Sequence, residues 1–292
     1  MMTHLPLTPL LPPMDQAEAI DLGLPESCVP WPLAPIGNLP LGQFTTESTL
    51  PGVVGSLARA NALGPWDWPE KPVIFISDLH ADAESLLRSL TAARTIQRNG
   101  NGLSDFHLTP FGRSCQFIIG GDCLDKGPSN LDLLDSLSAL LKTGADVVIL
   151  AGNHDLRLYL GLEALTVKRS SLNAHMFVRM GKKVMPLLKE VHERYVGSSA
   201  NLAMLPDEET CLSLMVPGKK WTRQFPKAAS RYLSDAAIRK EMQRLKKKAD
   251  KFAEHAAEVG LTIRQLYAAA LKCRELFVEP GGRYAWFFQS LK

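Results

Sequence analysis

The stretch VIFISDLH, residues 73–80, is a short β-rich apolar run followed directly by an aspartate and a histidine. Two later stretches repeat this arrangement, QFIIGGDCLDKGP at 116–128 and DVVILAGNHD at 146–155. A continuous apolar run of this length is typical of a strand buried on both faces of a sheet. In each stretch the polar residues come where the strand should end.

Helical signals separate these runs. Leu86, Leu87 and Leu90 lie on one side of a helical stretch after the first run. Ser129 is a suitable N-cap for a helix with leucines at 131, 134, 137 and 141, and Gly144 is suited to end it. The alternation of strand and helix predicts a layered α/β domain with a largely parallel sheet.

Composition sets broad limits on the class of protein. The chain has 292 residues, 46% hydrophobic, with 33 Lys+Arg against 30 Asp+Glu, which excludes a wholly disordered, collagenous or coiled-coil protein. No run of about 18 apolar residues is present, so we expect no membrane helix and no membrane partner. The N-terminus lacks the basic region of a secretory signal, and the five cysteines are scattered. We therefore expect reduced thiols and a cytoplasmic protein.

The chain divides into four parts by composition. Residues 1–70 are rich in proline and predict an irregular arm, with Trp66 and Trp68 as candidate anchors. Residues 71–160 carry the α/β pattern, residues 161–280 have the composition of a helical insertion or cap, and residues 281–292 begin a further core segment. No aromatic residues interleave the lysine run 246–248, so we interpret it as a solvated helix face and expect no nucleic-acid partner.

The polar residues after the three runs are predicted to share one site. In open α/β sheets, ligands bind at the carboxyl ends of the strands, which brings together Asp78, His80, Asp122, Asn153 and His154. Carboxylates, imidazole and an amide oxygen suit Mn, Fe or Zn. An Asp-x-His alone has little diagnostic value, and Gly-Asn-His-Asp alone also fits a polar turn. The ordered set, each member following an apolar run, is a strong signal.

Two glycines precede these polar residues. Gly121 and Gly152 are expected to permit sharp turns at the strand ends, where the backbone must direct its side chains toward the metals. Asp122, in the middle loop, is best placed to bridge two cations.

This ordered set resembles the calcineurin-like metallophosphoesterase superfamily, whose motifs run Asp-x-His, Gly-Asp-x-x-Asp-Arg, Gly-Asn-His-Asp/Glu, a separate His, and Gly-His-x-His. The Gly-Asp-x-x-Asp-x-Gly-Pro form at 121–128, followed by a leucine-rich helix, is most similar to the phosphoprotein-phosphatase branch and its bacterial relatives. The resemblance covers about residues 71–160. It implies a β-sandwich flanked by helices, two divalent metal ions, and attack of a metal-bound hydroxide on a phosphate ester.

The resemblance also implies a role for each matching residue. Asp78 and His80 would bind the first metal, Asp122 would bridge, and Asn153 would bind the second metal and contact the phosphate. His154 would be the general acid, held by Asp125.

The pairing of His154 with Asp125 also makes chemical sense without the family. A histidine must be protonated to donate to a leaving oxygen, and a neighbouring carboxylate stabilises that form and fixes the tautomer. Asp155 directly follows His154 and is better suited to cap the helix that starts there.

The sequence departs from the family in two places. Lys126 stands where the family has an arginine that holds a phosphate oxygen, and it lacks the bidentate fork; Arg157 is a candidate substitute. No later motif supplies the remaining histidine ligands. The downstream histidines, His175, His192 and His255, each lie in a helical stretch, where a packing or surface role is expected.

The last residues offer an interpretation of these missing ligands. The apolar run Tyr284–Phe288 resembles the family segment that precedes the strand leading to the next metal-binding histidine, and it stops without an evident partner or cap. We therefore expect this chain to be the N-terminal part of a longer enzyme, with an incomplete phosphoesterase fold.

Two functional hypotheses remain. The first is a metal-dependent phosphoesterase acting on a phosphorylated protein or small molecule. The second is a catalytically degenerate or truncated phosphoesterase-fold protein that serves as a binding module. The missing histidines favour the second, whereas the intact His154–Asp125 pair favours the first.

Overall fold

The structure is a computed structural model that describes residues 69–197 and 202–292. The predicted proline-rich arm, with its candidate anchors Trp66 and Trp68, lies outside the described residues except at its last two positions.

A three-stranded parallel sheet forms the centre of the α/β part, with strand order β1 (Val73–Ile76), β4 (Gln116–Ile119), β5 (Asp146–Ile149). The three strands coincide with the three apolar runs, which confirms the expectation of a parallel sheet. The register aligns Ile76, Ile119 and Ile149 on the face that packs into the core. On the opposite face Phe75 remains 60% exposed. Among the described residues this sheet has no second sheet packed against it as in a sandwich.

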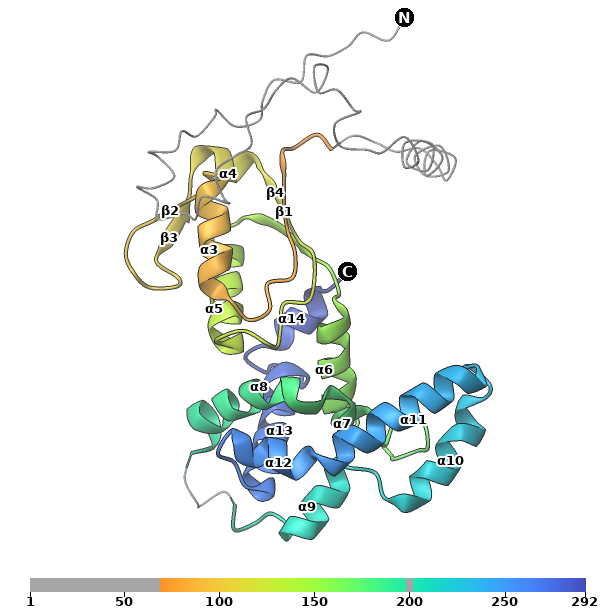
Figure 1. Cartoon of the computed structure of the whole chain (residues 1–292). Helices are drawn as coiled ribbons and strands as arrows, with labels where there is room; N and C mark the ends of the chain where they lie inside the picture. The colour runs from red at the N-terminus through yellow and green to blue at the C-terminus, as the bar shows by residue number, and fades with distance from the viewer. Residues whose placement is uncertain (1–68, 198–201) are drawn as a thin grey trace, which may run out of the picture.

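The helices between the strands begin and end at the residues with capping signals. The hydroxyl of Ser129 accepts a hydrogen bond from the Asp132 N–H and begins α5 (Asn130–Lys142), and Gly144 follows in the left-handed region at φ 81°. Asp82 caps α3 (Ala83–Ala92) in the same way. Figure 1 shows α3 and α5 together beside the strands, and their leucines fill the core.

A small antiparallel hairpin between α3 and β4 is absent from the expectations above. It consists of β2 (Ile96–Arg98) and β3 (Phe106–Leu108), followed by the short helix α4 (Pro110–Ser114). Strands of three residues are too short for alternating polarity to reveal them.

The helices from α6 to α13 pack as a second lobe below the sheet (Figure 1). Helix α6 leaves the sheet and enters this lobe. Its helices are α6 (Asn153–Glu163), α7 (Met176–Met180), α8 (Met185–Val191), α9 (Glu208–Met215), α10 (Lys219–Ala229), α11 (Asp235–Asp250), α12 (Phe252–Glu258) and α13 (Ile263–Phe277), with short helical turns at Gly181–Val184 and His192–Val196. No helix in the described part of the chain is long and apolar enough to cross a bilayer.

The last residues return to the sheet. Residues 285–290 form α14 (Ala285–Ser290), and Leu291 then makes a parallel bridge to Ile149 of β5. The expectation that the run Tyr284–Phe288 has no partner is wrong: Tyr284 and Phe287 are fully buried, and the Tyr284 ring lies 5.2 Å from that of Phe277.

Candidate metal centre and active site

Backbone hydrogen bonds continue the pairing of β1 with β4 beyond the strand ends. The N–H groups of Asp78, His80 and Ala81 donate to the carbonyls of Gly121, Asp122 and Cys123 at 3.2, 3.0 and 2.6 Å. The loop after β1 therefore lies against the loop after β4. This pairing brings their polar side chains to one edge of the sheet, as the strand-end rule predicts.

These two loops hold an unusual backbone conformation. Seven described residues other than glycine have positive φ, and all but Arg94 lie here. They are Asp78, His80, Ala81, Asp122, Asp125 and Lys126, with φ between 44° and 71°. Each such residue costs about 1–3 kcal/mol, and conformations of this kind persist where surrounding contacts enforce them, often at functional sites.

Asp78, His80 and Asp122 form a group whose potential ligand atoms all lie within 4.8 Å of one another. His80 Nε2 is 3.8 Å from an Asp78 carboxylate oxygen. The Lys126 ammonium approaches the same Nε2 at 2.8 Å, so a cationic group already lies beside it. Two carboxylates and one imidazole with this spacing fit a divalent cation such as Mn, Fe or Zn.

Asn153 lies beside Asp122 but presents its amide nitrogen. Asn153 Nδ2 donates to the two carboxylate oxygens of Asp122 at 3.4 and 3.1 Å. To offer its oxygen to a cation next to Asp122, the amide must rotate by about half a turn, a change that needs no backbone movement. Asp122 and Asn153 are the only two predicted donors at this second position.

His154 and Asp125 form a close pair. His154 Nδ1 lies 2.6 Å from Asp125 Oδ2, and the imidazole is 8% exposed. The other ring nitrogen, Nε2, faces the metal group, 3.9 Å from Asp122 Oδ2. His154 therefore has one nitrogen held by a carboxylate and the other directed toward the site.

Two residues that the sequence reasoning missed hold Asp125 in place. The Asp125 N–H donates to Asn130 Oδ1 at 2.7 Å, and Asn130 Nδ2 donates to Glu190 at 3.2 Å. Asn130 is fully buried. Nothing near Asn130 in the sequence signals this role, because Glu190 is 60 residues away.

Asp155 joins the loops after β4 and β5 on the core side of the site. Its carboxylate accepts hydrogen bonds from the N–H groups of Gly152, Cys123 and Leu124 at 3.1, 3.3 and 3.1 Å. The bond from Gly152 caps the start of α6, as expected, while the other two fix the Asp122 loop. Burial raises the pKa of the Asp155 carboxyl, although these three donors oppose the shift. Burial also raises the pKa of the neighbouring Cys123 thiol, which keeps it protonated.

The two strand-end glycines have different roles. Gly121 adopts φ 83°, which glycine accommodates readily. Gly152 has an ordinary φ of −81°, so the expectation of a sharp turn there is wrong. Glycine is needed at 152 for another reason: a Cβ would lie 1.9 Å from the backbone nitrogen of Asp122.

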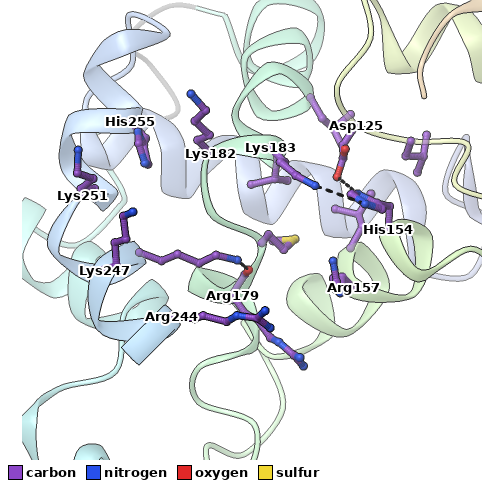
Figure 2. Close-up of a pocket in the computed structure, with 16 residues that line it drawn as sticks. Asp125, His154, Arg157, Arg179, Lys182, Lys183, Arg244, Lys247, Lys251 and His255 are labelled. Atoms are coloured by element: carbon purple, nitrogen blue, oxygen red, sulfur yellow. Dashed lines mark hydrogen bonds and ion pairs between the residues drawn. The ribbon is translucent and has the colours of Figure 1, made fainter. Parts of the chain in front are cut away.

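His154 also borders a pocket of about 330 Å³ between α6, the segment 179–187 and the C-terminal half of α11 (Figure 2). Arg157, the candidate phosphate ligand, lies on its wall three residues beyond His154. Lys183 from the turn 181–184 lies 3.5 Å from His154 Nε2. The sequence reasoning missed Lys183, since nothing in the sequence indicates which part of the helical region faces the site.

The downstream histidines do not join the metal group. His175 is buried, with its ring 5.0 Å from that of Trp221 and 4.9 Å from that of Phe225. His192 begins the turn 192–196, and His255 lies across the pocket from His154 (Figure 2). The expected packing role therefore fits His175.

Comparison with protein-family models matches residues 71–246 to the calcineurin-like phosphoesterase family. The match covers more than half of the chain and extends from β1 through most of α11, well beyond the three strand-end motifs. Comparison with curated proteins found no match, and comparison with solved structures found none. The chain belongs to the calcineurin-like phosphoesterase family.

Proposed function

We propose that this protein hydrolyses phosphate esters at a site that uses two divalent metal ions. The observation that carries the proposal is the group of Asp78, His80 and Asp122 next to His154 in a chain of this family. The three residues of the group would hold one cation, and Asp122 with Asn153 would hold the second. When bound, such cations activate water for attack and neutralise charge on the phosphoryl oxygens.

The residues around this group would bind the phosphate. Lys126 lies beside His80 and would contact a phosphoryl oxygen. Arg157, one helical turn beyond His154, would supply a second positive charge. Asn153 would contact the phosphate from the start of α6.

His154 would donate the proton that the leaving oxygen needs. The 2.6 Å contact at Nδ1 places one ring proton between His154 and Asp125, so in the protonated imidazole the other proton, the one to be donated, is on Nε2, which is directed toward the site. Asp125 holds the ring and stabilises its positive charge. Its other oxygen, Oδ1, is buried without a partner among the described residues, so the carboxylate depends on His154.

The finer assignments remain part of this proposal. The loop 121–128 supports a place near the phosphoprotein-phosphatase branch. We further propose a phosphorylated protein or small molecule as substrate and a cytoplasmic location. Mn and Fe are the metals that we would test first.

The test is the release of p-nitrophenol from p-nitrophenyl phosphate by the purified chain with added Mn²⁺. We expect turnover, its loss on chelation, and its loss in Asp122→Asn, which removes charge from both cation positions. Asp135→Asn is the matched control, because Asp135 lies on α5 and forms an exposed ion pair with Arg283. Retention of stoichiometric metal and full turnover by Asp122→Asn would refute the bridging role.

The alternative is a phosphoesterase fold that binds without catalysis. It is favoured by the second cation position, which has only two predicted donors, one of them with its amide nitrogen turned inward. A folded chain that binds Mn²⁺ and phosphate but releases no p-nitrophenol would support this alternative.

A further inference from the structure

The pocket beside His154 is strongly cationic. It is lined by eight lysine and arginine side chains and by one carboxylate, Asp125, which already pairs with His154. These cations come from three segments: Arg157 on α6, three residues between 179 and 183, and four residues between 244 and 251 on α11 and its C-cap. Figure 2 shows Lys247 and Lys251 on the side opposite His154 and Arg157.

Most of this charge is not neutralised by the protein. Arg157, Lys182, Arg244 and Lys247 take part in no ion pair with any described residue. Burial lowers the pKa of Lys248, and repulsion from Arg157 and other cations lowers it further. A cluster of like charges destabilises the fold unless an anion compensates for it. The arrangement therefore indicates an anionic ligand with several charges.

The apolar floor of the pocket limits the chemical class of this anionic ligand. It consists of aliphatic and methionine side chains, including Leu158, Met180 and Leu187. Among the described residues that line the pocket there is no Phe, Tyr or Trp, and the aromatic rings are those of His154 and His255. A single nucleic-acid strand is usually held by a series of aromatic rings on which successive bases stack, and two histidines on opposite sides of the pocket do not form such a series (Figure 2). An apolar floor under a ring of cations is better suited to a compact chain of phosphate groups, because a low local dielectric strengthens each ion pair.

His154 connects this pocket to the metal group. Its Nε2 lies 3.9 Å from Asp122 on one side and 3.5 Å from Lys183, a pocket residue, on the other. A leaving group that takes a proton from His154 would thus extend into the pocket.

We infer, on the basis of the function proposed above, that the substrate is a phosphate chain: one terminal phosphoryl group reacts at the Asp78–His80–Asp122 group, and the remaining phosphates occupy the cationic pocket. The chain is either inorganic or attached to a nucleoside. Residues of the helical lobe then determine substrate specificity.

The reaction is a hydrolysis that consumes one water molecule. The water oxygen forms a bond to the terminal phosphorus and releases one proton to solvent. The bond from that phosphorus to the bridging oxygen breaks, and the bridging oxygen leaves with the electron pair and takes a proton from His154. The products are orthophosphate and a phosphate chain shorter by one unit, and no oxidant or reductant is required.

Binding tests the pocket without catalysis. Tripolyphosphate is titrated into the metal-free 292-residue chain by calorimetry, with Arg244→Gln/Lys247→Gln as the pocket variant. The matched control is Arg239→Gln/Lys246→Gln, which removes the same charges from exposed positions of α11 outside the pocket. Each lost charge-assisted hydrogen bond is expected to weaken binding about tenfold, so Kd should rise roughly 100-fold in the pocket variant. It should change little in the control.

Turnover then tests the substrate class. We expect wild-type kcat/KM to be higher for tripolyphosphate and ATP than for p-nitrophenyl phosphate. The ratio of kcat/KM for tripolyphosphate to that for p-nitrophenyl phosphate should fall by roughly 100-fold in the pocket variant and stay constant in the control. A preference for ATP over tripolyphosphate would identify the nucleoside-linked form of the chain.

Failure of this inference is distinct from failure of the proposed function. If p-nitrophenyl phosphate is hydrolysed but the pocket variant binds tripolyphosphate as tightly as wild type does, the pocket assignment is wrong. The proposed phosphoesterase function is then still supported. If nothing is hydrolysed, the calorimetric comparison still decides the pocket. Tighter binding of a single-stranded oligonucleotide than of tripolyphosphate would overturn the inference in favour of a nucleic-acid surface.

Discussion

Removing the charge of Asp125 is a sensitive test of the proton donor. In Asp125→Asn the His154 ring keeps a neutral acceptor but loses the carboxylate that lies 2.6 Å from Nδ1. A hydrogen bond to a charged group contributes about 1.5–3 kcal/mol. Because His154 is only 8% exposed, we take about 2 kcal/mol, which corresponds to roughly a 30-fold loss of turnover. His154→Ala removes the donor and should cost about 10²- to 10⁴-fold.

The assay compares two substrates that differ in their leaving group. Phenol is a poor leaving group that depends on proton donation, whereas 2,4-dinitrophenol departs readily without it. The loss of kcat/KM in Asp125→Asn and His154→Ala should therefore be large for phenyl phosphate and small for 2,4-dinitrophenyl phosphate, with bound metal unchanged.

A matched control and a refuting result complete this test. Asp132→Asn removes a carboxylate from the exposed ion pair with Arg194 and should leave turnover unchanged. Equal losses for both substrates in the Asp125 and His154 variants would refute the role of His154 as proton donor. Loss of metal together with activity would instead make His154 a ligand.

Three further predictions concern the stability of the folded protein. Asn130→Ala leaves the Asp125 N–H without its acceptor and should destabilise the fold by about 1–3 kcal/mol. Gly152→Ala places a Cβ against the Asp122 loop and should cost at least about 2 kcal/mol, lowering Tm and metal affinity together. Burial lowers the pKa of His175 to about 4, so up to about 3 kcal/mol of stability is lost as pH falls from 6.5 to 4; His175→Leu should remove this loss.

All three are measured by chemical or thermal unfolding, and two of them have a matched control. Gly218→Ala matches Gly152→Ala, since both glycines are N-caps with similar φ but Gly218 has open space around its Cβ position. For His175, the control is substitution of the exposed His107, and an unaltered pH dependence in His175→Leu would contradict the assignment. For Asn130→Ala, wild-type stability would show that the bond to Asp125 contributes nothing.

The sheet and the position of the site were predictable because both follow from local patterns. Three apolar runs predicted three parallel strands, and the rule that ligands bind at strand ends predicted that Asp78, His80 and Asp122 lie together. The helix after Ser129 followed from its cap and its leucine spacing.

Residue roles that depend on packing between distant segments were not predictable from the sequence. The lysines near 247 look like a solvated face in sequence, and only the packing of α11 against α7 and the turn 181–184 brings them to the pocket beside His154. Gly152 resembles a turn glycine, but its requirement comes from the approach of the Asp122 backbone 30 residues away. Asn130 forms side-chain hydrogen bonds with both Asp125 and Glu190, and no local sequence pattern predicts them.

The central claim is that a cation bound by Asp78, His80 and Asp122 is required for phosphate ester hydrolysis. The most direct measurement titrates Mn²⁺ into the metal-free chain and records bound metal and p-nitrophenyl phosphate turnover in the same samples. The account predicts that turnover is absent without metal, rises with occupancy and saturates with it. Turnover in the metal-free chain, or full occupancy of these ligands with no turnover by the folded protein, would contradict it.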